Sequence, residues 1–186
     1  MKYEPLIEDS YYHIYNCGNN KENLFIDDEN YSYSLKLIKK YLLDTCDILS
    51  YCLLKNHFHL IIKTKPHVES KIISQSFSNL FNAYSKAINK KYGRSGSLFK
   101  DRFSRIKIDN EDYLKSLVIY IHTNPVHHNF TDNFRTYKYS SFMAFISDRP
   151  TLLQRVFVIR LFEDKENFIF VHNNKQINIL ENLLLE

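Results

Sequence analysis

The pattern of hydrophobic and polar positions changes period several times along the chain. Short β-branched and aromatic runs are typical of strands, and longer segments with apolar residues at helical spacing are typical of amphipathic helices. Strands are predicted over residues 11–15, 48–54, 57–63 and 103–108. Helices are predicted over residues 28–44, 68–91, 111–124, 152–162 and 165–172. This order favours an α+β fold, with helices packed on one face of an antiparallel sheet.

The composition fits a globular protein with a real core. The chain has 186 residues, of which 44% are hydrophobic and 25% are charged. No apolar stretch approaches the ~20 residues that span a bilayer, and the first residues lack the apolar core of a signal peptide. We therefore expect a cytoplasmic protein with no membrane partner. The odd number of cysteines, without paired metal spacing, predicts reduced thiols at Cys17, Cys46 and Cys52.

Basic residues are concentrated in one segment, between Lys86 and Lys107. The segment contains eight basic residues and a single acidic one, in a chain whose net charge is only +4. Such a concentration is expected for a protein that binds a polyanion, although a solvated basic face is the alternative. The candidate DNA-binding residues are Lys90, Lys91, Arg94, Lys100, Arg102, Arg105 and Lys107.

Two histidines lie one residue apart in the predicted strand 57–63. Alternate side chains of a strand share a face, so His57 and His59 point the same way, whereas Phe58 points into a core. Two imidazoles on one strand face can grip a single metal ion. The plainer alternative is a pair of exposed histidines on a half-buried strand.

The helix beginning at Glu111 carries a tyrosine and an asparagine one turn apart. Tyr120 borders the apolar stripe of this helix, and Asn124 lies on nearly the same side. A tyrosine hydroxyl is a poor nucleophile at neutral pH unless its attack is assisted. A divalent ion on His57 and His59 could assist attack on a phosphate, with the Asn124 amide oxygen as third ligand. The alternative role for Tyr120 is simple packing.

Four motifs resemble those of one known family when they are taken together and in order. The His57-Phe58-His59 stretch resembles the HUH motif of IS200-like single-tyrosine transposases. The segment from Tyr120 to Val126 is similar to the tyrosine motif of the branch called REP-associated tyrosine transposases. The segments from Gly93 to Arg102 and from His13 to Asn20 also resemble that family.

The resemblance implies a fold and an activity. Residues 1–130 would form a ferredoxin-like catalytic domain, and residues 131–186 a mostly helical C-terminal extension. His57, His59 and Asn124 would bind Mg²⁺ or Mn²⁺, and Tyr120 would attack a DNA phosphate to leave a 5′-phosphotyrosine. The substrate would be single-stranded DNA with hairpin ends, and the protein could act as a homodimer. The alternative is a domesticated, non-catalytic protein that only binds DNA hairpins.

Some side chains have two readings that the sequence leaves open. His13 either packs as an ordinary strand residue or approaches the proposed active site. His122, His127 and His128 crowd the end of the tyrosine helix, and a solvated helix end is the favoured interpretation. The aromatic residues near the basic segment either stack on unpaired bases or pack in the core. These aromatic residues are Tyr92, Phe99 and Phe103.

Overall fold

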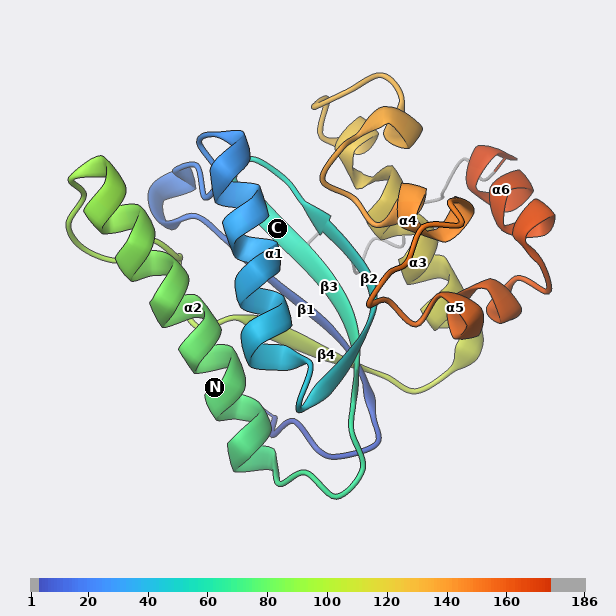
Figure 1. The fold of residues 1–186 in the computed structure, drawn as a ribbon, viewed down its shortest axis with the longest axis horizontal. Helices are drawn as coiled ribbons and strands as arrows, with labels where there is room; N and C mark the ends of the chain where they lie inside the picture. The colour runs from blue at the N-terminus through green and yellow to red at the C-terminus, as the bar shows by residue number, and fades with distance from the viewer. Residues whose placement is uncertain (1–3, 175–186) are drawn as a thin grey trace.

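Four strands form one antiparallel sheet in the computed structural model, which describes residues 4–174 (Figure 1). They are β1 (Tyr11–Cys17), β2 (Cys46–Leu53), β3 (His57–Thr64) and β4 (Ser104–Ile108). The order across the sheet is β2-β3-β1-β4, so β3 and β1 are central and β4 lies at one edge. The predicted α+β fold with an antiparallel sheet is confirmed.

Strand β1 is longer than the sequence pattern predicts. The prediction ended it at Tyr15, where turn-forming residues begin. In the structure Asn16 and Cys17 still pair with Phe58 and His57 of β3, so backbone pairing carries the strand two residues further. The extension matters because it brings the end of β1 beside the histidine pair.

Two long helices cover one face of the sheet. These are α1 (Asp28–Leu42) and α2 (Ser70–Tyr92), which lie side by side in Figure 1. Their buried side chains, such as Phe77, join Ile14 and Leu60 of the central strands in one hydrophobic core. This is the helical layer that the sequence pattern predicted.

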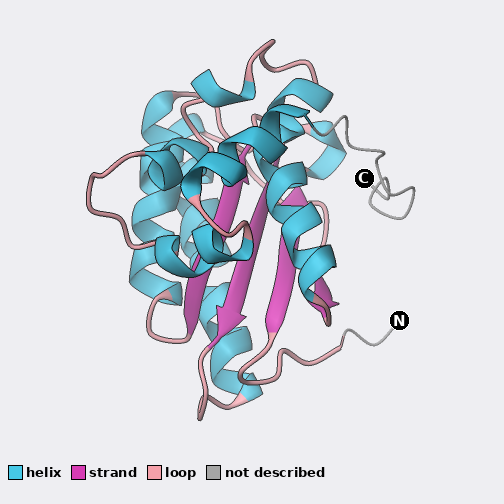
Figure 2. Ribbon diagram, turned by 90° about the vertical axis from the view of Figure 1, so that its right-hand side faces the viewer, coloured by secondary structure: helices cyan, strands magenta, loops and turns pink. Residues whose placement is uncertain are grey.

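The opposite face of the sheet is also covered, which differs from the prediction of helices on one face. Helix α3 (Glu111–His127) packs there, and its Leu117 and Ile121 join Cys52 and Ile61 of the sheet in a second core. Figure 2 shows helices on both sides of the strands. Residues 117–125 of α3 are all buried, so this helix lacks the one-sided apolar stripe that marks a surface helix.

The segment after α3 packs against that helix and completes the second core. Its buried aromatic residues include Phe142, Phe145 and Phe168. The helices α5 and α6 match the two predicted short helices, whereas α4 and the two 3-10 turns were not predicted. The bounds are η1 (Asn19–Lys21), η2 (Phe134–Thr136), α4 (Phe142–Ile146), α5 (Arg155–Leu161) and α6 (Lys165–Asn174).

Helix α3 continues through Pro125, where the sequence predicted that it would end. Proline lacks an N–H group, so only the backbone bond to the Ile121 carbonyl is lost. Because Pro125 lies in the last turn, that loss is small and the helix reaches His127. The following turn is closed by the amide of His128, which donates to the Asn124 carbonyl at 3.0 Å. The proline therefore leaves Asn124 within a regular helix.

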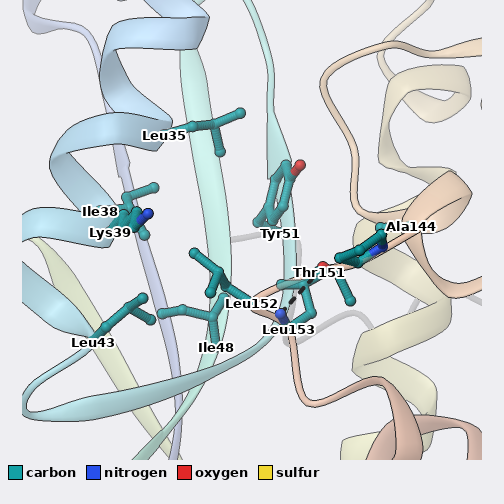
Figure 3. Close-up of a pocket in the computed structure, with 11 residues that line it drawn as sticks. Leu35, Ile38, Lys39, Leu43, Ile48, Tyr51, Ala144, Thr151, Leu152 and Leu153 are labelled. Carbon is teal, nitrogen blue, oxygen red and sulfur yellow. Dashed lines mark hydrogen bonds between the residues drawn. The ribbon is translucent and has the colours of Figure 1, made fainter.

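An apolar pocket of about 400 Å³ opens between α1, β2 and the loop around residues 150–153 (Figure 3). Leu35 and Ile38 line it from α1, and Ile48 and Tyr51 line it from β2. The histidine pair does not line this pocket. Between residues 4 and 174, none of the helices combines the length and the hydrophobicity that a membrane span requires.

Candidate active site

The histidine pair of β3 lies under helix α3. Phe58 and Leu60 point into the core beneath α1 and α2, so His57 and His59 point to the other face. His57 is 5% exposed and His59 is fully buried. Their ring centroids are 5.2 Å apart, and the ring planes are perpendicular. This burial excludes the alternative of two exposed histidines on a strand.

Helix α3 brings Tyr120 and Asn124 to the same place. The side chain of Asn110 caps the start of the helix and accepts a hydrogen bond from the Tyr113 amide at 2.7 Å. About four turns later, the Asn124 Oδ1 atom lies 3.2 Å from Nε2 of His57. The Tyr120 ring meets the His59 ring edge to face, with centroids 5.7 Å apart.

The four residues named from the sequence thus gather in one cluster within one chain. Tyr120 is 4% exposed and Asn124 is fully buried. Tyr120 and Asn124 each contact a different histidine of β3. This is possible because four residues along a helix and two residues along a strand cover similar distances. The cluster combines a phenol, two imidazoles and an amide, which is chemically suited to metal-assisted phosphoryl transfer.

A third histidine, His13 of β1, also joins the cluster. Its Nε2 atom lies 2.9 Å from Nδ1 of His59, and it is 2% exposed. The ring centroids are 5.1 Å apart, and the ring planes differ by 20°. Of the two readings left open by the sequence, the structure therefore supports approach to the site. The pairing register of β1 with β3, which decides this contact, has no signal in the local pattern around His13.

The prediction of a solvated helix end is wrong for His122. This residue is fully buried, and its Nδ1 atom lies 2.9 Å from Nε2 of His172 in α6. Its Nε2 atom lies 3.1 Å from the Ser50 hydroxyl and 2.8 Å from the Ser141 hydroxyl. Burial lowers the pKa of His122 well below its usual value. His122 therefore connects α3, through hydrogen bonds, to Ser141 and His172 of the segment that follows the helix.

His127 and His128 do lie at an exposed helix end, as the sequence indicated. They nevertheless border the cluster. The His128 ring lies 4.6 Å from the His57 ring, and the His127 ring lies 6.4 Å from the Tyr120 ring. Partial burial lowers the pKa of His127. Both side chains flank the cluster where α3 meets solvent.

The donor atoms of the cluster fit a divalent cation. Imidazole nitrogens suit transition-metal ions, whereas an amide oxygen suits Mg²⁺ and Mn²⁺. The Nδ2 atom of Asn124 is buried without a hydrogen-bond partner among the described residues. The Oδ1 atom of the same amide is the one that faces His57. No group of three or more His, Cys, Asp or Glu side chains that could hold a metal is found in residues 4–174.

Three of the candidate DNA-binding residues form ion pairs with acidic side chains near them. Lys91 forms ion pairs with Asp27 and Glu29, both at 2.8 Å. The Lys91 ammonium is the main reason that the pKa of Asp27 falls to about 2. Arg94 forms an ion pair with Glu22. A further pair joins Lys107 and Asp109. These three basic side chains are therefore engaged within the protein.

The other four candidates are Lys90, Lys100, Arg102 and Arg105. Lys90, Lys100 and Arg102 are exposed. Arg105 is half-buried, with its guanidinium 4.3 Å from the centre of the Phe103 ring. Three of the four, Lys100, Arg102 and Arg105, line a polar groove of about 1300 Å³ between α2 and the segment before β4. Serine and asparagine side chains of α2, such as Ser78 and Asn82, form its other wall.

The aromatic residues of this region serve the core. Phe99 and Phe103 are 8% and 7% exposed and belong to the core beneath α1 and α2. Tyr92 is half-buried, and its hydroxyl donates to Asp27 at 2.6 Å. The core-packing reading is thus the right one for the two phenylalanines, and base stacking on them is excluded in this arrangement.

The fold and the cluster can now be compared with known proteins. Residues 7–124 match the family model described as "Transposase IS200 like", which is well over half of the chain. By class, then, the protein is a transposase, an enzyme that cleaves and moves DNA. More particularly, the chain belongs to the IS200-like transposase family. The matched residues include the histidine pair, Tyr120 and Asn124.

One solved structure agrees with this assignment at the level of fold. It is described as the REP-associated tyrosine transposase bound to a REP hairpin, with a TM-score of 0.64 and 18% identity over 81% of this chain and 88% of that chain. Another, a putative transposase from Deinococcus radiodurans R1, has a TM-score of 0.43 and 10% identity over 62% and 91%. No curated protein matches the sequence.

Proposed function

We propose that this transposase cleaves and rejoins single-stranded, hairpin-bearing DNA through a covalent 5′-phosphotyrosine at Tyr120, with a divalent metal ion as cofactor. One observation carries the proposal: helix α3 sets Tyr120 against His59 and Asn124 against His57 within a single chain. A protein that only binds hairpins needs none of these contacts. All four proposed site residues come from one chain, so the proposal does not require a second copy.

His57, His59 and Asn124 would hold Mg²⁺ or Mn²⁺. When bound, the ion would polarise the scissile phosphate and offset the negative charge that develops on its oxygens. The two imidazoles favour Mn²⁺ over Mg²⁺, because Mg²⁺ prefers an all-oxygen shell. We therefore expect Mn²⁺ to support activity at lower concentration than Mg²⁺.

Tyr120 would act as the nucleophile. Its hydroxyl oxygen forms a bond to phosphorus, and the bond from phosphorus to the 3′ oxygen breaks. The phenol loses one proton and the leaving oxygen gains one, which yields a free 3′ hydroxyl. Burial of Tyr120 and His59 limits access of water, so the phosphotyrosine bond would survive until a 3′ hydroxyl returns to rejoin the strand.

The DNA would be held mainly through its phosphates. The proposed contacts include the exposed side chains of Lys90, Lys100 and Arg102, and Arg105 lines the same polar groove as Lys100 and Arg102. Phosphate contacts set the register of the strand and carry little sequence information. The solved relative bound to a REP hairpin supports a hairpin as the partner.

The test uses single strands that carry a hairpin, taken from the DNA beside the gene. With Mn²⁺ present, the wild-type protein should cleave the strand and become covalently attached to it. His57→Ala and His59→Ala should both abolish cleavage and leave phosphate-driven binding largely intact. Binding by the wild-type protein that never leads to cleavage, with any divalent ion, would instead support the hairpin-binding alternative.

A further inference from the structure

Both histidines of β3 have a close polar contact at the same ring nitrogen, Nδ1. The Nδ1 atom of His57 lies 2.8 Å from Oδ1 of Asn56. The Nδ1 atom of His59 lies 2.9 Å from Nε2 of His13. With both Nδ1 atoms engaged, Nε2 is the nitrogen that each ring can offer to a metal ion, and Nε2 of His57 already faces Asn124.

The partner of His59 is unusual because it is itself a histidine. An asparagine oxygen only accepts hydrogen bonds, and Asn56 Oδ1, 2.8 Å from Nδ1 of His57, is a closer acceptor than Asn124 Oδ1, 3.2 Å from Nε2. The neutral His57 ring therefore carries its proton on Nδ1. A neutral imidazole can donate or accept at either nitrogen, so the bond between His13 and His59 has two possible directions. Only one direction leaves Nε2 of His59 with a lone pair for a metal ion.

We propose that His13 is a positioning residue for the metal site: it accepts the Nδ1 proton of His59 and so fixes His59 in the tautomer that presents Nε2 as a metal ligand. This inference rests on the proposed function, since His59 must be a ligand for it to hold. His13 itself would carry its proton on Nδ1, and its Nε2 lone pair faces His59. A metal-binding histidine is commonly oriented in this way by a hydrogen bond to its second nitrogen.

The geometry of His13 suits a fixed orienting group. It lies on the central strand β1, whose neighbours β3 and β4 pair with it on both sides. Its ring is 2% exposed and contacts the rings of His59, with centroids 5.1 Å apart, and Tyr15, with centroids 4.9 Å apart. A side chain held in this way loses little further freedom when it makes the hydrogen bond. The contact is therefore a preformed feature of the sheet.

A matched pair of variants separates the hydrogen bond from packing. In His13→Gln, the amide oxygen is as many bonds from the backbone as Nε2 and can accept the same proton. His13→Met has the same length but no comparable acceptor. Both variants remove the ring, so a purely structural role would affect them alike. Thermal unfolding without metal records any general loss of stability.

The primary readout is Mn²⁺ affinity, measured by electron paramagnetic resonance of the free ion. We expect His13→Met to bind Mn²⁺ roughly 10–100-fold more weakly than wild type, the usual effect of removing an orienting partner, and His13→Gln to recover most of that loss. The second readout is the nitrogen NMR spectrum of the metal-free protein with labelled histidine. It should show His59 protonated on Nδ1 in the wild type and in His13→Gln, and a mixture of tautomers in His13→Met.

Equal Mn²⁺ affinity in the two variants, or wild-type His59 protonated on Nε2, would overturn the role of His13. A different result would overturn the proposed function instead. If His59→Ala binds Mn²⁺ as tightly as the wild type, His59 is not a ligand and the metal site itself is wrong. The two failures are therefore distinguishable in one set of titrations.

Discussion

A buried chain of hydrogen bonds fastens the tyrosine helix to α6, and its strength can be measured. Nδ1 of His172 donates to the Phe168 carbonyl at 2.7 Å, so its Nε2 must accept. The donor is Nδ1 of His122, at 2.9 Å. Nε2 of His122 in turn accepts from a serine hydroxyl, at 2.8 Å for Ser141. All of these groups are buried, so a broken link leaves a polar atom without water.

The magnitude follows from what each substitution leaves behind. His122→Leu roughly conserves volume but orphans Nε2 of His172, which costs about 1–3 kcal/mol, and it loses about 1 kcal/mol of net hydrogen bonding. We expect the free energy of unfolding to fall by about 3 kcal/mol, equivalent to about 6–12 °C in melting temperature for a chain of this size. His172→Leu should cost a similar amount because it orphans Nδ1 of His122.

The double variant separates this hydrogen bond from general damage to the core. With both imidazoles gone, neither leaves an orphaned partner in the other. The double variant avoids both orphan costs of about 1–3 kcal/mol each, so it should be less destabilised than the sum of the singles by about 2–6 kcal/mol. The assay is urea unfolding followed by circular dichroism at pH 7.5. Single-variant losses that add to within about 0.5 kcal/mol would refute the coupling.

Three further predictions concern titration, thiol reactivity and DNA binding. Burial lowers the pKa of His172 to about 4, so this residue binds a proton in the unfolded chain at a higher pH than in the folded protein. The free energy of unfolding should therefore fall by about 1.4 kcal/mol per pH unit as the pH drops from 6.5 toward 4. Urea unfolding of His172→Leu should lack this pH dependence. Burial raises the pKa of the Cys46 thiol to about 11, so a thiol reagent should label the half-buried Cys17 much faster in peptide mapping. Lys100→Ala should reduce the slope of log binding constant against log salt concentration for single-stranded DNA by about 0.7. Lys91→Ala removes a charge that is paired within the protein and should change that slope less. Equal slopes for the two variants would contradict the assignment of contacts.

The elements that the sequence predicted well are those with a one-sided pattern. The helices α1 and α2 show apolar residues on one stripe and polar residues on the other, and both were placed to within a few residues. Helix α3 was also predicted, but the sequence pattern did not predict that the later helices cover the side of α3 that faces away from the sheet. Because it lies between the sheet and the later helices, residues 117–125 are buried all round, and no local period marks that arrangement.

The candidate site likewise combines features that follow from local sequence with contacts that depend on long-range packing. Within strand β3 and helix α3, the spacing of His57 and His59, and of Tyr120 and Asn124, follows from local geometry alone. Their meeting depends on how α3 packs on the sheet, which the family resemblance implied and the spacing did not. His13 reaches His59 only through the register of β1 with β3, and the burial of His122 depends on His172, fifty positions further along the chain. Such long-range contacts leave no trace in a local pattern.

The central claim is that Tyr120 is the residue that becomes joined to DNA. A second tyrosine offers a strict control, because the ring of Tyr15 also stacks near His59, with centroids 6.0 Å apart. The measurement is mass spectrometry of the protease-digested adduct formed with a hairpin-bearing single strand and Mn²⁺. The account predicts a nucleotide attached to the peptide that contains Tyr120, an adduct retained in Tyr15→Phe and no adduct in Tyr120→Phe. An adduct that persists in Tyr120→Phe, or that maps to Tyr15, would contradict it.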